Sequence, residues 1–185
     1  MDIGVIGVGA MGRNHVRVYS ELKGVDTVYV YDPAAENAER SREFATICKS
    51  LQELLDKVDA VSICVPTRYH FDTAKKVIDA GINCLIEKPI TLTVGEGNQL
   101  LKLIEGKKLV VGVGHIERFN PIVAEMTKIA QRPDYVAIKR HNPTSSRITD
   151  ASVVEDLMIH DIDIAFNVLF KGEGDYKIFS AGSAN

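Results

Sequence analysis

The sequence predicts an α/β fold built on a doubly wound parallel sheet over its first two-thirds. Short apolar runs alternate with amphipathic stretches, which is the pattern of strands buried on both faces with helices between them. Three glycines follow directly on the first apolar run. Because strand–helix–strand crossovers are right-handed, this alternating order predicts an open sheet with helices on both faces.

The apolar runs predict strands over residues 3–8, 27–31, 60–65, 84–87 and 109–113. The amphipathic stretches between them predict helices over residues 11–22, 34–44, 51–55, 69–80 and 94–105. Three of these helices are followed by the glycines at positions 24, 81 and 106. Glycine commonly ends a helix because it adopts a left-handed backbone at no steric cost, so we interpret these three as helix stops.

The rhythm changes after His115. A helix is expected over residues 121–129, a strand over 135–140, a helix over 154–170 and a strand over 177–181. One helix packed on two strands makes a thin core, so this region is interpreted as incomplete. We expect a doubly wound domain over residues 1–117 and the start of an incomplete α+β domain over 118–185.

The composition of the 185 residues is typical of a globular protein, with 45% hydrophobic and 25% charged residues. A net charge of -3 without a block of like charge argues against a nucleic-acid partner and favours small molecules. Cys48, Cys64 and Cys84 lie in or beside apolar runs, which indicates reduced, buried thiols in a cytoplasmic protein. No signal peptide or membrane partner is expected, since no apolar run reaches the roughly 18 residues that a membrane-spanning helix needs.

Gly7, Gly9 and Gly12 fit the pattern G-x-G-x-x-G between a predicted strand and a predicted helix. In that setting the first glycine makes a tight turn, the second lets a diphosphate approach the main chain, and the third lets helix and strand pack closely. The start of the helix offers amide donors to the phosphates. We therefore expect an NAD(P)-binding Rossmann fold, with Ala10 and Met11 also contacting the cofactor. A glycine turn without a ligand is the alternative, and Met11 also fits a filler of the core.

Asp32 ends the second predicted strand. A carboxylate at this position hydrogen-bonds both ribose hydroxyls of NAD and repels the 2'-phosphate of NADP. Pro33 follows where an arginine would be needed to bind that phosphate. The expected cofactor is therefore NAD. The alternative role of Asp32 is to cap a helix that starts after Pro33.

Four further motifs follow the glycine turn: CVPTRYH at 64–70, EKP at 87–89, GHIERFNP at 114–121 and EDLMIHDID at 155–163. Together and in this order they resemble the family of glucose-fructose oxidoreductase, inositol dehydrogenase and MocA. Within that family, GHIERFNP is similar to a segment of archaeal UDP-N-acetylglucosamine 3-dehydrogenases. The resemblance implies a homo-oligomeric NAD-dependent oxidoreductase that takes a hydride from a secondary hydroxyl of a sugar or nucleotide-sugar.

Members of that family are usually near twice this length, with a C-terminal domain whose large open sheet walls the substrate pocket. The resemblance therefore implies that residues 118–185 are a truncated version of that domain. A truncated gene product, a fragment and half of an enzyme completed by another chain all stay open. So do two other functions, an inositol or other sugar dehydrogenase and a dinucleotide-binding module or subunit without catalysis.

Oxidation of a sugar hydroxyl requires a group that takes the hydroxyl proton, and Lys88, Asp156 and His160 are the candidates. Asp156 and His160 are four residues apart on a predicted helix, so the carboxylate can support the charged imidazole. His160 is the first choice as base. The resemblance implies that Lys88 hydrogen-bonds the reacting oxygen, although a desolvated lysine beside a cationic cofactor also suits the role of base.

Each candidate has a non-catalytic alternative. Asp156 and His160 also fit a surface pair, and Lys88 also fits a solvated side chain after a strand. His160, Asp161 and Asp163 are metal-ligand types, but their spacing does not put three on one helical face, so no metal is expected. Pro89 is a candidate for a cis peptide bond, although most such bonds are trans.

The resemblance assigns one further group of residues to cofactor contact, namely Val65, Pro66, Thr67, His70, Glu87 and Lys88. Arg118 and Asn120 join His160 as candidates for substrate contact, since the arginine fork suits a phosphate. His70 equally fits a cap or a packing residue of the following helix. Arg118 equally fits an ion pair with Glu117 or Glu125.

Overall fold

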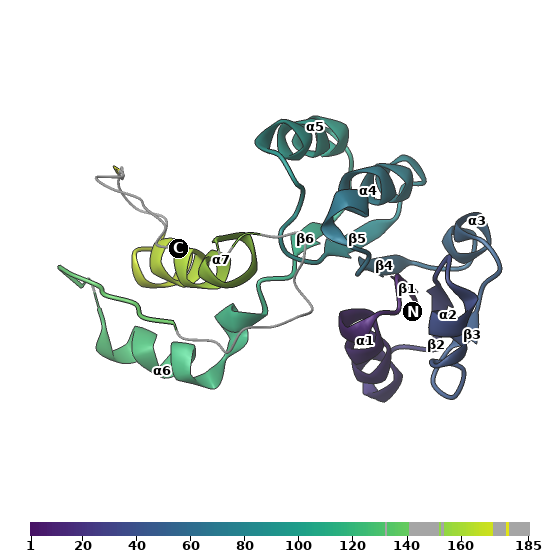
Figure 1. Cartoon of the computed structure of the whole chain (residues 1–185), viewed down its shortest axis with the longest axis horizontal. Coiled ribbons are helices and arrows are strands. Elements are labelled where there is room, and N and C mark those ends of the chain that lie inside the picture. Colours follow the sequence, from purple (N-terminus) through teal and green to yellow (C-terminus); the bar gives the residue numbers. More distant parts are fainter. Residues whose placement is uncertain (132, 141–151, 153, 172–176, 178–185) are drawn as a thin grey trace. The chain divides into compact units, whose positions relative to one another are not determined.

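The computed structural model describes residues 1–131, 133–140, 152, 154–171 and 177 (Figure 1). The chain divides into two compact units, Met1–Gly114 and His115–Asn185. The first unit contains a parallel sheet covered by helices. The described residues of the second unit form helices and connecting segments.

Six parallel strands form the sheet of the first unit, in the order β3-β2-β1-β4-β5-β6. Their bounds are β1 (Asp2–Ile6), β2 (Thr27–Tyr31), β3 (Thr46–Ile47), β4 (Ala60–Ile63), β5 (Asn83–Ile86) and β6 (Val111–Val113). The strand order reverses between β1 and β4, and Ile6 pairs with both Tyr31 and Ile63. The predicted doubly wound parallel sheet is confirmed, and its switch point lies at the carboxyl end of β1.

Helices cover both faces of this sheet, with α4 and α5 above the strands and α1 below them in Figure 1. Their bounds are α1 (Ala10–Glu21), α2 (Ala35–Glu39), α3 (Leu51–Leu55), α4 (His70–Asp79) and α5 (Val94–Ile104). Val5, on one face of β1, packs with Val16 of α1 and Ala38 of α2. Ile6, on the other face, belongs to the larger core with residues of α3, α4 and α5. Alternation along one strand thus produces two cores.

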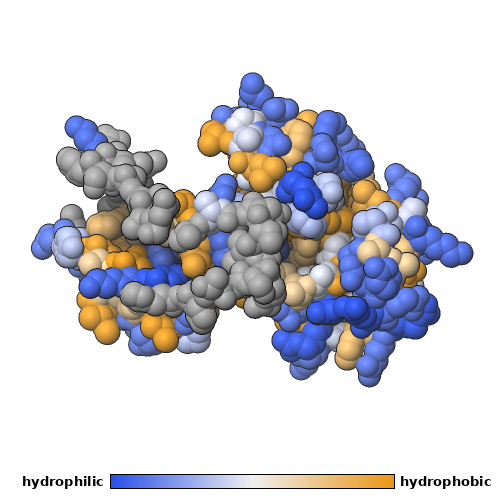
Figure 2. All heavy atoms as spheres, viewed as in Figure 1, coloured by the Kyte–Doolittle hydropathy of each residue, from blue (hydrophilic) through white to orange (hydrophobic). Residues whose placement is uncertain are grey.

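Several helix ends follow directly from local sequence. Thr93 and Glu96 form a reciprocal capping box at the start of α5, which stabilises a helix by about 1 kcal/mol. The three predicted glycine stops all have positive φ, at 93° for Gly24, 76° for Gly81 and 72° for Gly106. The surface over α5 is partly apolar (Figure 2), with Val94 82% exposed. Single exposed apolar residues are normal at a surface.

Two expectations for the first unit need correction. The helix expected over 34–44 ends at Glu39, and the following residues form turns in which the Ser41 amide bonds to the Ala38 carbonyl. The strand β3 was not expected, because its two residues carry no periodic pattern of their own. It exists through pairing with β2, with Tyr29 opposite Thr46.

The second unit begins with a 3-10 turn (Ile116–Phe119) and α6 (Pro121–Ile129), as the sequence predicts for the helix. The helix expected over 154–170 is present, but only its centre, α7 (Ile159–Asp163), is α-helical. Its two ends, Val154–Met158 and Ile164–Leu169, are π-helical. A small core joins Val123 of α6 with Ile164 and Leu169.

The strand expected over 135–140 is wrong, since these residues form no strand. A strand needs a partner for its main-chain groups, and the part of the chain that the structure describes supplies none there. The strand expected over 177–181 lies outside the described residues, except for Lys177. None of the described helices has the length and apolar character that crossing a bilayer requires.

The three cysteines carry free thiols, as predicted. Cys48 and Cys84 are buried, and Cys64 is partly buried at the carboxyl end of β4. Burial raises the pKa of the Cys84 thiol to about 11. It raises the pKa of Cys64 further, together with the nearby charge of Glu87. Both thiols are therefore protonated near neutral pH.

Candidate functional site

Of the three glycines in the turn between β1 and α1, two are crowded by the protein and one is open. Gly7 has φ of 85°, and a Cβ there would lie 2.8 Å from the Val65 amide nitrogen. A Cβ on Gly12 would lie 1.9 Å from the Gly7 carbonyl oxygen, whereas a Cβ on Gly9 would meet no atom within 4 Å. Gly7 and Gly12 are therefore required by the fold itself. The bare main chain at Gly9 serves no internal packing, which fits the approach of a ligand.

The start of α1 supplies donors beside this open position. Gly9 is the N-cap residue and has no side chain to cap the helix, and the first internal bond shown runs from the Arg13 amide to the Gly9 carbonyl at 3.1 Å. The preceding amides of the first turn can thus meet an anion from outside. Met11 is 41% exposed, so it is not a filler of the core. This arrangement fits a cofactor diphosphate.

Asp32 lies next to the same turn, at the end of β2. Its Oδ2 accepts the Val8 amide at 2.8 Å, and its Oδ1 accepts the Ala34 amide at 2.8 Å. The second bond closes a local turn before α2. The N-cap residue of α2 is Ala34, so Asp32 does not cap that helix. Each carboxylate oxygen can still accept another hydrogen bond. The carboxylate is therefore fixed at the carboxyl edge of the sheet with capacity for a ribose hydroxyl.

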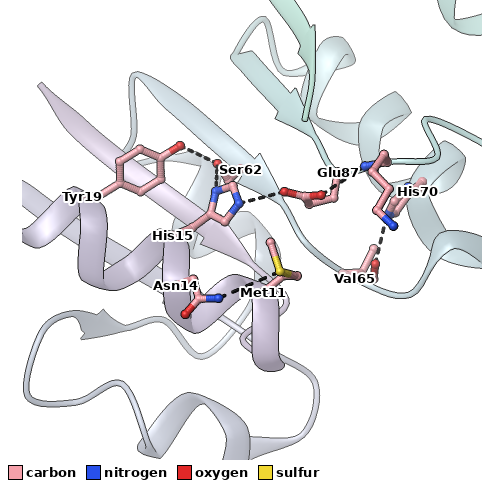
Figure 3. A network of polar contacts seen from close by, with 9 residues as sticks. Met11, Asn14, His15, Tyr19, Ser62, Val65, His70 and Glu87 are labelled. Carbon is pink, nitrogen blue, oxygen red and sulfur yellow. Dashed lines mark hydrogen bonds and ion pairs between the residues drawn. The ribbon is translucent and has the colours of Figure 1, made fainter. Parts of the chain in front are cut away.

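A chain of buried and partly buried polar groups runs from α1 to the end of β5 (Figure 3). The Tyr19 hydroxyl lies 2.6 Å from Ser62 Oγ, which lies 3.0 Å from His15 Nδ1. The other ring nitrogen, His15 Nε2, lies 2.9 Å from Glu87 Oε1. Each link pairs a donor with an acceptor. We call these four residues the Glu87 network.

Sequence reasoning missed His15, Tyr19 and Ser62. The signals available were weak: His15 and Tyr19 are four residues apart on one helix, and Ser62 interrupts an otherwise apolar strand. Neither spacing says which group they would meet. Glu87, the partner of His15, is distant in sequence. It comes near Ser62 and His15 because β4 and β5 are neighbours in the sheet.

Electrostatics keep Glu87 ionised. Burial by itself raises the pKa of Glu87, but the hydrogen bond and charge of His15, with the Lys88 amide and charge, outweigh it and lower that pKa. The Lys88 amide donates to Glu87 Oε2 at 3.2 Å. A Cβ on Gly114 would lie 3.0 Å from Glu87 Oε1, so the glycine after β6 leaves room for this carboxylate. The Glu87 side chain thus bonds within the protein, and its contact with a cofactor stays a prediction.

The segments after β4 and β5 are linked by His70, the first residue of α4. Its Nδ1 lies 2.7 Å from the Pro89 carbonyl oxygen, and its Nε2 lies 2.8 Å from the Val65 carbonyl oxygen. His70 is 1% exposed, so it packs inside the unit. This agrees with the interpretation of His70 as a packing residue of the helix that it starts. The Lys88–Pro89 peptide bond is cis.

The carboxyl edge of the sheet therefore collects most of the predicted cofactor residues. These are the glycine turn after β1, Asp32 after β2, the segment Val65, Pro66 and Thr67 after β4, and Glu87 and Lys88 after β5. In a sheet that is wound in both directions, this edge is where ligands bind. Cofactor contact by each residue stays a prediction.

In the second unit, the side chains of two predicted substrate residues have partners of their own. Arg118 Nε donates to Asp163 Oδ2 at 2.6 Å, and Arg118 Nη2 donates to Oδ1 of the same carboxylate. The partner of Arg118 is therefore neither Glu117 nor Glu125, the two that the alternative interpretation offered. Burial by itself raises the pKa of Asp163, but the bonds from Arg118 and Asn167 and nearby positive charge lower it.

Asn120, the other predicted substrate residue, caps α6 by accepting the Ile122 amide at 3.0 Å. Its amide nitrogen also donates to Glu117 Oε2 at 3.1 Å. Contact of Arg118 or Asn120 with a substrate therefore stays a prediction.

The catalytic candidates lie in different units. Lys88 belongs to the first unit, whereas Asp156 and His160 lie on the π-helical and α-helical parts of one helix in the second. A common catalytic centre stays a prediction.

Two of the residues considered as metal ligands form ion pairs instead. Arg140 Nε contacts both carboxylate oxygens of Asp161 at 2.9 Å, and Arg118 forms an ion pair with Asp163. Both carboxylates are thus engaged by arginines, which counts against the metal alternative.

Comparison with known proteins agrees with this geometry. Residues 1–115 match an oxidoreductase family with an NAD-binding Rossmann fold. A UDP-N-acetylglucosamine 3-dehydrogenase of Acidithiobacillus ferrooxidans is 39% identical over 190 aligned residues, which cover 100% of this chain and 58% of that protein. An inositol 2-dehydrogenase of Corynebacterium glutamicum is 26% identical over 89% of this chain and 52% of its own length.

Solved structures show the same likeness. The structure of the Acidithiobacillus enzyme is 37% identical, with a TM-score of 0.83 over 92% of this chain and 57% of that one. The chain thus spans somewhat more than half the length of the relatives it matches. The resemblance to this type of dehydrogenase is confirmed, but its expected archaeal character is not.

Proposed function

This chain belongs to the oxidoreductase family of glucose-fructose oxidoreductase, inositol dehydrogenase and MocA, and on that premise we propose that it takes part in NAD-dependent oxidation of a sugar hydroxyl. The substrate we propose is UDP-N-acetylglucosamine, oxidised at its 3-hydroxyl, because the relative that matches the whole chain carries that name. The observation that supports a dinucleotide cofactor is the open space at Gly9 beside the start of α1.

The chain's own residues provide the binding chemistry. The amides at the start of α1 bind the diphosphate, and Asp32 accepts the ribose hydroxyls while its negative charge repels a 2'-phosphate. When bound, NAD+ supplies the acceptor for the hydride. The Glu87 network holds the main chain of Lys88 through the bond from its amide to Glu87.

His160 is proposed as the base that takes the hydroxyl proton as the carbon is oxidised to a carbonyl. Asp156, one turn earlier, supports the positive charge that the imidazole then carries. Lys88 donates a hydrogen bond to the reacting oxygen and stabilises the negative charge that develops there.

A second candidate function is a dinucleotide-binding module without catalysis of its own. It is favoured by one observation: the glycine turn, Asp32 and the Glu87 network all lie within Met1–Gly114. That unit holds the proposed cofactor residues without any contribution from Asp156 or His160.

Two features of the setting are also part of the proposal. Three free cysteines favour a reducing compartment such as the cytoplasm. The strands β3 and β6 end the sheet, and edge strands can pair with other chains, which favours a homo-oligomer. Both are tested by localisation and by light scattering of the purified protein.

The enzymatic proposal is tested by NADH formation with UDP-N-acetylglucosamine, and by calorimetric titration with NADH. The variants Lys88→Ala and His160→Ala are compared with Lys76→Ala, which removes an exposed lysine of α4. Turnover lost in the first two variants and kept in the third would support the assignment. Binding of NADH without turnover, and without a response to the nucleotide sugar, would favour the binding module. A chain that binds no dinucleotide would refute both.

A further inference from the structure

The His70 ring lies between two main-chain carbonyl groups. Its Nδ1 is 2.7 Å from the Pro89 oxygen and its Nε2 is 2.8 Å from the Val65 oxygen. A carbonyl oxygen accepts hydrogen bonds and cannot donate them. Both ring nitrogens must therefore donate, and only the doubly protonated imidazolium carries two N–H groups.

A neutral ring would fit this position poorly. One of its nitrogens would present a lone pair to a carbonyl oxygen within hydrogen-bond distance, and the ring is 1% exposed, so water cannot intervene. A buried polar atom without a partner is costly. Burial disfavours a cation, but hydrogen bonds made by the charged form favour it.

His70 lies beside the part of the sheet edge that would take the second half of a dinucleotide. Val65 follows β4 and Pro89 follows β5, so both carbonyl groups lie at the carboxyl edge of the sheet. Asp32, after β2, marks the side of the sheet on which the adenosine ribose is bound. The second half of a dinucleotide then extends from the glycine turn over β4 and β5, which is the part that His70 links.

We propose that His70 is a positioning residue that ties the segments after β4 and β5 together and carries a fixed positive charge beside the nicotinamide half of the site. The second part of this statement rests on the proposed function. The oxidised nicotinamide ring is cationic and the reduced ring is neutral, so a fixed cation disfavours NAD+ relative to NADH. His70 therefore raises the dissociation constant of NAD+ relative to that of NADH.

The charge is tested directly on the unmodified chain by NMR of its five histidines, with ring nitrogens labelled by 15N. For His70 we expect two protonated ring nitrogens with similar shifts at neutral pH. A single protonated nitrogen and a second, non-protonated one at a clearly different shift would overturn the proposal. This measurement requires no cofactor and no activity, and a merely packed, neutral histidine would not give the expected signals.

The effect on the cofactor is tested by the dissociation constants of NAD+ and NADH. In His70→Gln, which keeps amide donors but no charge, we expect the ratio of the NAD+ to the NADH constant to fall about fivefold, as for removal of one unit charge near another in a partly screened interior. His70→Asn provides a second neutral variant. Lys76→Gln removes an exposed positive charge from the same helix, and its ratio should match the wild type.

The outcomes separate this inference from the proposed function. A wild-type chain that binds neither nucleotide would overturn the proposed function and the cofactor part of this inference, while the ring signals would still decide the charge of His70. Binding of both nucleotides with an unchanged ratio in the neutral variants would overturn only the inference. Unfolding of both variants would leave the decision to the NMR measurement on the wild type.

Discussion

Alanine in place of Gly9 should weaken cofactor binding and leave the fold intact. The new methyl group would meet no protein atom within 4 Å, and the Gly9 φ of -65° is an ordinary value for alanine. The stability cost is then that of a poorer helix N-cap, about 1 kcal/mol or less. The methyl group fills the space we assign to the diphosphate. Forcing a methyl group into such a contact costs about 1–3 kcal/mol, which corresponds to about 5- to 150-fold weaker binding.

Gly12→Ala should have the opposite effect, because it should destabilise the fold. Its Cβ would lie 1.9 Å from the Gly7 carbonyl oxygen and 2.9 Å from the Gly7 carbonyl carbon. Both are main-chain atoms, so strand and helix must separate. We expect a loss of at least about 1–3 kcal/mol in the free energy of unfolding. Gly95→Ala is the control, because its nearest neighbour would be Thr93 Oγ1 at 3.8 Å and alanine favours a helix by up to about 1 kcal/mol.

Two measurements on each variant decide the matter. Urea unfolding gives the stability, and titration followed by NADH fluorescence gives the dissociation constant. Gly9→Ala with wild-type affinity for NADH would show that no diphosphate lies at this turn. Gly12→Ala with wild-type stability would show that the close approach of α1 to β1 is not required.

Two further outcomes are expected. The folded state lowers the pKa of Glu87 below its ordinary value of 4.5, so its contribution to stability is present above that value and is lost as the pH falls through the lowered one. Urea unfolding at a series of pH values should thus show that the stability difference between wild type and His15→Ala narrows in acid, and a constant difference would contradict the reasoning. Asp32→Asn should reduce the preference for NADH over NADPH about tenfold by removing a like charge, as measured by the two dissociation constants. An unchanged preference would show that Asp32 does not select NADH over NADPH and that its role is limited to its hydrogen bonds with the main chain.

Much of the first unit could be predicted from sequence because its signals are local. The buried strand at 27–31 and the helix at 51–55 have the bounds that the apolar pattern predicts. The glycine turn is likewise local: a positive φ at Gly7 and the contact of Gly12 with the Gly7 carbonyl concern residues five positions apart. Patterns over a few residues suffice where the partner is on the same turn or the next strand.

The amino-acid sequence by itself thus determined the alternation of strands and helices, the glycine turn, and the position of Asp32 at the end of its strand. Only the tertiary structure decided which polar groups meet. It brought His15 to Glu87 and His70 to the carbonyl groups of Val65 and Pro89, and it paired Arg118 with a different carboxylate from those expected. Such contacts depend on which strands and helices become neighbours. A hydrogen bond between residues far apart in the chain leaves no periodic signal in the sequence, since only the folded backbone sets the distance between them.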